Sequence, residues 1–349
     1  MALLAALSSL SKSPELHLNF SVLHIEHGLR PPEESRGDAD FVLDFCGRGG
    51  IDCKIKRIPP GKIASLAGEK GTGIEAAARY FRHKAFRGEA KRRIEQSRGE
   101  SLHDNSNDQA RKKAVILLAH TNDDLLETTL MRVLRGAGPA GLRAMRPDNR
   151  DAGSHAVSRA ASRGSEDIEI ARPLLNMTRG DIENYLKAKN VSWREDSTNN
   201  DEKFLRNRIR RSLTPVLNES FPGWKKGVAA LGETQSLVNG FILREAKKRI
   251  EYVLAKDNRG KFLIADEENF FAQPEIIREE SIFYGIDILL SGKKSLSKPA
   301  KRSVIRKFCA GSVNAADLGL VRIWRKGGKI YISRARKDVF ERGISCLLV

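Results

Sequence analysis

Cysteine is scarce in this chain of 349 residues: there are four, and no two of them form a CxxC pair. Zinc, iron–sulfur and disulfide sites need paired or clustered cysteines, so this spacing disfavours all three. Long apolar runs are missing as well, since AVILLA at 114–119 falls far short of the roughly 18 residues that span a bilayer. The apolar N-terminus lacks a preceding basic segment and a convincing cleavage site. We therefore expect a cytoplasmic protein without a signal peptide or membrane helix.

Acidic residues are outnumbered: 44 Asp and Glu stand against 62 Lys and Arg, which gives a net charge of +18. This excess favours polyanionic partners, although charge alone does not separate RNA, DNA and anionic lipid. The length allows two or three domains, with a core large enough to fold without disulfides.

Strand-like and helix-like segments alternate in the first half of the chain. The hydrophobic periods predict strands at 18–28 and 112–120, and helices at 1–10, 39–50, 74–86 and 123–136. This alternation predicts an α/β fold with a doubly wound parallel sheet, in which ligands gather at the carboxyl ends of the strands. His24, His27 and His120 would lie near such an end. For His24 and His27 we favour a structural role, because no third metal ligand is spaced with them.

The character of the chain changes after Pro215. Long charged helical patterns occupy 225–255 and 275–292, and a β-type stretch at 319–335 contains a Gly-Gly hairpin turn. We therefore predict three domains: an α/β domain at 1–213, a helical domain at 214–291 and a small α+β domain at 292–349. Two polar segments, 95–112 and 148–167, are predicted to be mobile surface loops.

Three acidic residues stand together in this basic chain, just past His120: Asp123, Asp124 and Glu127. Thr121 and Asp124 have the spacing of a capping box, and acidic residues are favoured in a first helical turn in any case. Glu127 lies one turn further along, on or near the same face. The cluster is therefore either a helix cap or a niche for something cationic, a metal ion or an ammonium group.

The stretch AHTNDDLLETTLMRVLRGAGPAGLRAM at 119–145 resembles the AHxxDDQxETxLMRLxRGxGxxGLxGM block of the tRNA(Ile)-lysidine synthetases, which are PP-loop ATP pyrophosphatases. Other blocks agree in order: HIEHGLR at 24–30, IEAAARYFRH at 74–83, ARPLL at 171–175 and WREDSTNNDEKFLRNRIRRSLTP at 193–215. Together they cover roughly residues 1–217. Glu26 and Leu125 depart from the pattern, where the family has Asn and Gln.

A larger departure lies at the front of the chain. The family begins with a strand and an SGGxDS loop whose backbone amides cradle ATP phosphates, and Met1 resembles the residue that follows this loop. We expect the true reading frame to start upstream, and we expect unpaired strand edges where a central strand is missing. Whether the chain as given is active stays open.

The resemblance implies an ATP-dependent ligase that forms a C–N bond. ATP, with Mg²⁺, would adenylate the wobble cytidine in the CAU anticodon of an isoleucine tRNA, and free L-lysine would then displace AMP. A basic exterior suits the tRNA, and a small acidic pocket suits Mg²⁺ or the lysine ammonium. A homodimer is left open.

By the same resemblance, the catalytic residues would be His120, Asp124 and Glu127, with Asp124 and Glu127 also holding lysine. No residue is assigned to a metal. The predicted tRNA or nucleotide contacts are Arg79, Arg82, Arg206, Arg208 and Arg210. The alternative for these arginines is a solvated basic surface.

Two other functions compete with the ligase. A PP-loop tRNA thiolase would adenylate a base similarly but deliver sulfur, and the cytidine-thiolating type carries CxxC pairs that are absent here. A non-catalytic tRNA-binding relative would have lost the ATP chemistry together with its loop.

Overall fold

The structure is a computed structural model that describes residues 1–16, 18–100, 113–147, 168–195, 205–257, 260–290 and 299–335. The polar segment at 148–167 lies outside these residues, and so does the part of the other polar segment that follows residue 100. Contacts divide the described residues into two compact units. One unit is drawn from positions 1–136, 145–147 and 168–229, and the other from positions 137–144 and 230–335.

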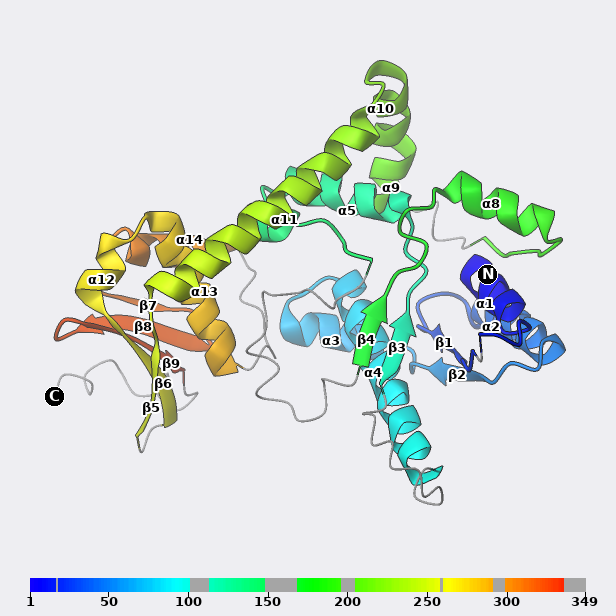
Figure 1. Ribbon diagram of the computed structural model, residues 1–349, viewed down its shortest axis with the longest axis horizontal. Helices are drawn as coiled ribbons and strands as arrows, with labels where there is room; N and C mark the ends of the chain where they lie inside the picture. The colour runs from blue at the N-terminus through cyan, green and yellow to red at the C-terminus, as the bar shows by residue number, and fades with distance from the viewer. Residues whose placement is uncertain are drawn as a thin grey trace. The chain divides into compact units, whose positions relative to one another are not determined.

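The first unit alternates helices with short strands (Figure 1). It contains α1 (Ala2–Leu10), β1 (Val22–Glu26), α2 (Pro32–Arg48), β2 (Cys53–Arg57), α3 (Lys62–Lys70), α4 (Ile74–Glu100), β3 (Ala114–Leu117), α5 (Asn122–Leu134), β4 (Ile168–Ala171), α8 (Arg179–Ala188), α9 (Leu205–Arg208), the π-helical turn η3 (Ile209–Leu213), α10 (Thr214–Ser220) and the start of α11 (Trp224–Arg249). Helices therefore form in all four regions where the sequence predicts them. Strands β2 and β4 were not predicted.

The strands of this unit pair in parallel, as expected for an α/β fold. β1 pairs with β2 from Val22↔Cys53 onward, and β3 pairs with β4 from Ala114↔Ile168 onward. The two pairs are separate two-stranded sheets, and within the described ranges no strand joins them into the single doubly wound sheet that we predicted. Both pairs contact α4, which touches β1, β3 and β4.

Small apolar cores hold the helices of this unit. Leu125 and Leu126 of α5 pack with Leu175, and Trp224 and Val228 of α11 cover them. Because these leucines lie on the buried face of α5, that helix is anchored close behind the end of β3. The acidic residues of its first turns are thereby held in a fixed orientation.

The second unit is built on an antiparallel sheet. It contains α6 (Pro139–Leu142), most of α11, β5 (Val253–Asp257), β6 (Gly260–Asp266), α12 (Glu267–Ala272), α13 (Glu275–Leu290), α14 (Pro299–Cys309), β7 (Ala315–Asp317), β8 (Val321–Lys326) and β9 (Lys329–Arg334). The strand order is β5-β6-β9-β8-β7, and α12, α13 and α14 pack against the sheet. Gly327 and Gly328 both have positive φ, 58° and 69°, which confirms the predicted hairpin turn.

One predicted helix is shorter than expected. The helical pattern extends to residue 255, yet α11 ends at Arg249 and Val253–Asp257 is β5, which pairs with β6. Pairing with a neighbouring strand overrides the local helical pattern here. Since β6 in turn pairs with β9, the sheet draws strands from both sides of residue 291. The division into three domains stays a prediction. None of the described helices is long and apolar enough to cross a membrane.

Candidate active site

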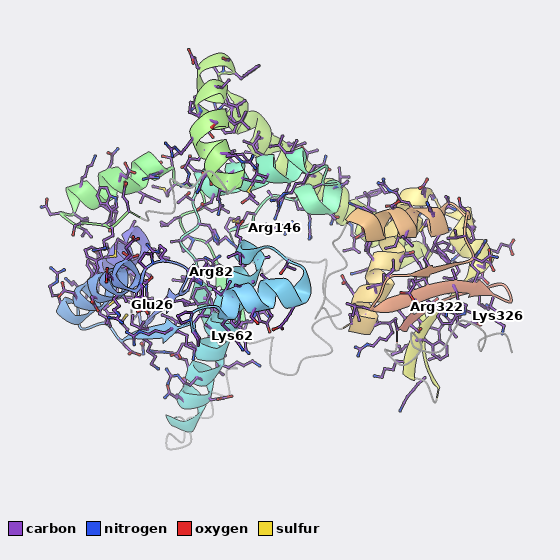
Figure 2. All side chains as sticks on the ribbon, turned by 180° about the vertical axis from the view of Figure 1, so that it is seen from behind. Glu26, Lys62, Arg82, Arg146, Arg322 and Lys326 are labelled. Atoms are coloured by element: carbon purple, nitrogen blue, oxygen red, sulfur yellow. The ribbon has the colours of Figure 1, made fainter. Side chains whose placement is uncertain are left out.

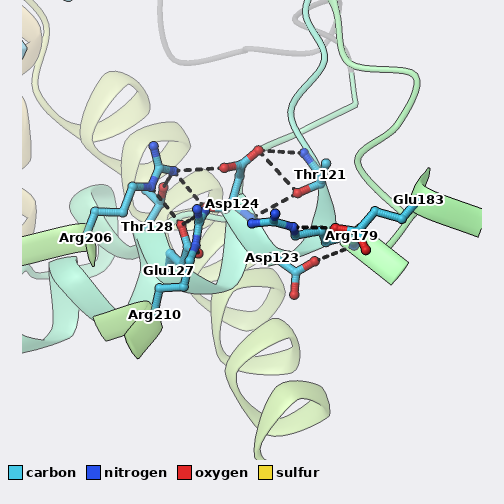
Figure 3. A network of polar contacts seen from close by, with 9 residues as sticks. All are labelled: Thr121, Asp123, Asp124, Glu127, Thr128, Arg179, Glu183, Arg206 and Arg210. Atoms are coloured by element: carbon cyan, nitrogen blue, oxygen red, sulfur yellow. Dashed lines mark hydrogen bonds and ion pairs between the residues drawn. The ribbon is translucent and has the colours of Figure 1, made fainter. Parts of the chain in front are cut away.

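The first turn of α5 begins with the predicted capping box. Thr121 is the N-cap in an extended conformation, and its hydroxyl accepts a hydrogen bond from the Asp124 backbone N–H at 3.3 Å. In return, the Asp124 carboxylate accepts a bond from the Thr121 backbone N–H at 2.9 Å. The capping box is therefore confirmed, and Asp124 is fixed at the helix start (Figure 3).

Glu127 lies one turn further on and is nearly buried, with 6 % of its side chain exposed. Arg206 Nε donates to its Oε2 at 2.8 Å, and Arg210 Nε donates to its Oε1 at 2.7 Å. Arg210 Nη2 adds a third hydrogen bond, to Oε2 at 3.1 Å. Burial lowers the pKa of Arg210, but its bond to Glu127 outweighs this and leaves that pKa raised. Two guanidinium groups thus offset the Glu127 charge.

The other two carboxylates are also engaged. Arg206 Nη2 lies 3.4 Å from Asp124 Oδ1. Asp123 Oδ2 accepts a hydrogen bond from the backbone N–H of Arg179 at 2.7 Å, in the first turn of α8. The acidic cluster therefore joins α5 to α8 and to the helical segment that carries Arg206 and Arg210 (Figure 3). In this structure, the cations that pair with Asp124 and Glu127 are arginine side chains.

The four arginines that follow residue 205 do not all face the same way. Arg206 on α9 and Arg210 in the π-helical turn η3 face Glu127, four residues apart. Arg208 and Arg211 are exposed. A single π-helical turn is often found at functional sites. Two of the four arginines, Arg206 and Arg210, therefore bind the acidic cluster, and the other two are exposed to solvent.

His120 lies between β3 and α5 and is half-buried. Its Nδ1 is buried and has no hydrogen-bond partner among the described residues. Burial lowers the pKa of His120 to about 4, with Asp124 opposing the shift and Arg172, Arg79 and Arg82 adding to it. The imidazole is therefore uncharged near neutral pH.

Several cations influence His120 together. Burial lowers the pKa of Arg82, and the charges of Arg79 and Arg206 lower it further. Burial and Arg79 likewise lower the pKa of Arg172, which lies directly after β4 and is 9 % exposed. Guanidinium groups that depress one another's pKa in this way form a site suited to an anion with several charges.

Sequence reasoning missed Arg172 and His83 as members of this cluster. Burial lowers the pKa of His83 to about 4, and the neighbouring arginines add to the shift. Arg172 stands at a strand end within the quoted ARPLL block, so its position was a usable signal. His24 has other neighbours: burial lowers its pKa, while the charges of Glu26, Asp38 and Arg30 also act on it.

The described residues contain no group of three or more His, Cys, Asp or Glu arranged to hold a metal ion. The carboxylates at the start of α5 bind main-chain N–H groups and arginines instead. The donor set in this part of the chain therefore does not fit a resident Mg²⁺ ion.

The chain belongs to the PP-loop domain family, which matches it over residues 1–96 and 106–217. Its relatives include proteins named tRNA(Ile)-lysidine synthase. That of Treponema denticola is 34 % identical over 300 residues, covering 85 % of this chain and 55 % of that protein. That of Shouchella clausii is 31 % identical over 256 residues, covering 73 % of this chain and 46 % of that protein. The chain thus spans about half the length of these curated relatives.

Among solved structures, the chain is similar to the U34-tRNA thiolase NcsA from Methanococcus maripaludis with its [4Fe-4S] cluster. The TM-score is 0.39 at 12 % identity, over 68 % of this chain and 67 % of that one.

Proposed function

We propose that this chain carries the ATP-dependent lysine-ligating site of a tRNA(Ile)-lysidine synthase. ATP would activate the wobble cytidine of the CAU anticodon in an isoleucine tRNA, and L-lysine would replace AMP to form a C–N bond. The observation that carries the proposal is the network at the start of α5, in which acidic residues and arginines meet beside His120. The relatives named tRNA(Ile)-lysidine synthase support the choice of reaction.

The network has the charges that an amino acid needs. A free amino acid bears a carboxylate and an ammonium group on the same carbon, so its site must offer both signs close together. Asp124 and Glu127 supply negative charge, and Arg206 and Arg210 supply positive charge within hydrogen-bonding distance of them. We infer that lysine enters by exchanging these internal ion pairs for pairs with its own α-ammonium and α-carboxylate groups. Such an exchange limits the desolvation cost, because each buried charge keeps a partner.

The arginines around His120 would take the phosphates of ATP. Arg79, Arg82 and Arg172 gather positive charge around His120, since the charges of all three lower its pKa. Membership in the PP-loop family supports ATP use. Arg208, which is exposed, is better suited to the tRNA backbone than Arg206 and Arg210, which are engaged with Glu127.

The chemistry of attack sets a further requirement. The lysine ε-amine has a pKa near 10.4 and is a nucleophile only when neutral. Carboxylates beside it would favour its charged form, so Asp124 and Glu127 are better suited to the α-ammonium group. His120 is uncharged near neutral pH, so its imidazole is suited to accept a hydrogen bond from the ε-amine and orient it. With a pKa of about 4 it is a positioning group rather than a strong base.

The test is ATP-to-AMP turnover and lysine incorporation, each measured with and without tRNA and lysine. In the proposal, Asp124→Asn raises the lysine KM by about tenfold or more and leaves tRNA affinity unchanged. The matched control is Asp181→Asn, because Asp181 forms the same capping box with Thr178 at the start of α8. That variant should keep the wild-type lysine KM.

Lysine analogues separate the two halves of the pocket. Cadaverine lacks the carboxylate, and 6-aminohexanoate lacks the α-amino group, so both should be poor substrates for the wild-type chain. In Arg206→Gln, the preference for lysine over cadaverine should shrink. Turnover that consumes ATP on tRNA but ignores lysine would refute the ligase, and tRNA binding without any turnover would favour a non-catalytic relative.

A further inference from the structure

The antiparallel sheet of the second unit has one face covered by helices and one face that is partly exposed. Residues opposite one another in register share a face, and residues alternate between faces along a strand. On β8 and β9, the pair Ile323↔Ile332 is fully buried, and the next pair, Trp324↔Tyr331, is only partly buried. The aromatic pair therefore lies on the outer face.

Three aromatic rings form a row across this outer face. Trp324 and Tyr331 are stacked, with ring centroids 5.2 Å apart and an interplanar angle of 10°. Phe262 of β6 is opposite Ser333, two residues along β9 from Tyr331, and its ring centroid lies 6.3 Å from that of Tyr331. The row is not part of the buried core cluster of this unit. All three side chains are partly exposed.

Cations flank the row on the same face. Arg322 and Lys326 both belong to β8 (Figure 2). They lie two residues before and after Trp324, so the alternation of side chains along a strand places the three on the same side. Lys329 is opposite Lys326 in register and is paired with Asp266 at 3.4 Å. In the part of the chain that the structure describes, no ion pair is formed by Arg322 or Lys326. Two cations thus lie on either side of the tryptophan; Asp317 of β7 is opposite Arg322 in register and accepts a hydrogen bond from the backbone N–H of Gly319.

We propose that this outer face, defined by Phe262, Tyr331, Trp324, Arg322 and Lys326, binds unstacked nucleobases of a single-stranded RNA segment. Flat aromatic surfaces stack on bases, and neighbouring cations pair with the phosphates between them. Charge complementarity favours a polyanion, and the stacked rings favour one that carries flat bases. The choice of RNA over DNA rests on the proposed function.

Tryptophan fluorescence provides a direct test. Trp324 is one of three tryptophans, so Trp193→Phe/Trp224→Phe leaves it as the only tryptophan. Titration of this full-chain variant with a short oligouridylate should quench the emission. An abasic ribose-phosphate oligomer of equal length should bind more weakly and quench less, because it has no bases to stack.

Substitutions then separate stacking from charge. Trp324→Leu should weaken oligouridylate binding about tenfold, while Trp324→Phe, which keeps a ring, should stay near wild type. Binding of the abasic oligomer should be the same in both. Arg322→Gln/Lys326→Gln should flatten the salt dependence of binding. The control Lys256→Gln/Lys261→Gln removes the same charge from an opposed pair on the other side of the sheet and should keep the wild-type slope.

Equal affinity for the oligouridylate and the abasic oligomer in the wild type would overturn the proposal. So would unchanged oligouridylate binding in Trp324→Leu, or loss of binding to anionic lipid vesicles in that variant without an effect on RNA. Lysine incorporation is measured separately with saturating tRNA. If lysine incorporation is absent but the oligouridylate quenches Trp324, the ligase proposal fails and the RNA-binding proposal stands. If lysine is incorporated but the oligouridylate does not quench Trp324, the RNA-binding proposal fails and the ligase proposal stands.

Discussion

Glu127→Gln tests whether the ion-pair network at the start of α5 forms in solution. Gln keeps the size of the side chain but removes its charge and one of the two acceptor oxygens. Three N–H groups of Arg206 and Arg210 donate to this carboxylate, and the carboxylate is nearly buried. The substitution therefore leaves two guanidinium groups facing each other without an anion between them.

The size of the effect follows from these contacts. Hydrogen bonds to charged groups contribute about 1.5–3 kcal/mol each, and breaking a buried pair costs about 3–5 kcal/mol. The side chains of Arg206 and Arg210 each remain 31 % exposed, so water partly replaces the lost partner. We therefore expect the free energy of unfolding of the first unit to fall by about 3 kcal/mol, at the low end of the buried-pair range.

Urea unfolding followed by tryptophan fluorescence measures this loss. In a Trp324→Phe background the remaining tryptophans, Trp193 and Trp224, both lie in the first unit, so the signal reports that unit. Adding Arg210→Gln to Glu127→Gln should cost little more, because their interaction is already lost.

Glu183→Gln serves as the control for this series. It breaks a more exposed pair with Arg179, in which the two side chains are 33 % and 50 % exposed, and should cost less than about 1 kcal/mol. A Glu127→Gln variant as stable as this control would show that the network does not form.

Three further predictions concern the same unit. Thr121→Ala should lower the free energy of unfolding by about 1 kcal/mol through loss of the cap, and Thr121→Ser should restore it, as measured by urea unfolding. Arg92 and Lys54 hold the pKa of Glu89 at about 2, so its stabilising effect is full above its ordinary pKa and is lost as pH falls toward 2; Glu89→Gln should therefore flatten stability against pH between about 5 and 2. His120 should titrate near pH 4 by NMR, and added pyrophosphate should raise its pKa by offsetting the nearby arginines.

Each of these has a contrary outcome. Equal stability of the Ala and Ser variants at position 121 would mean that the Thr121 cap does not stabilise α5. Parallel pH profiles for wild type and Glu89→Gln would mean that the lowered pKa contributes nothing to acid unfolding. A His120 pKa that does not respond to pyrophosphate would separate the histidine from the arginine cluster.

Local features of the fold can be predicted from the sequence. The Thr121–Asp124 spacing predicted a capping box, and Gly327–Gly328 predicted a hairpin turn; both depend on residues no more than a few positions apart. The amphipathic pattern predicted α5 for the same reason. For Val253–Asp257 the prediction was wrong: its sequence pattern is helical, but the segment forms a strand because it pairs with β6.

The sequence by itself determined the parallel α/β class of the first unit, the position of α5 and the gathering of three carboxylates at its start. Only the tertiary structure decided what those carboxylates contact. Glu127 binds Arg206 and Arg210, which are 79 and 83 positions away in the sequence. Arg208, which lies between these two arginines in the sequence, is exposed. No local pattern encodes such a pairing, because it depends on how α5 and α9 pack, and packing is set by apolar contacts distributed over the whole unit.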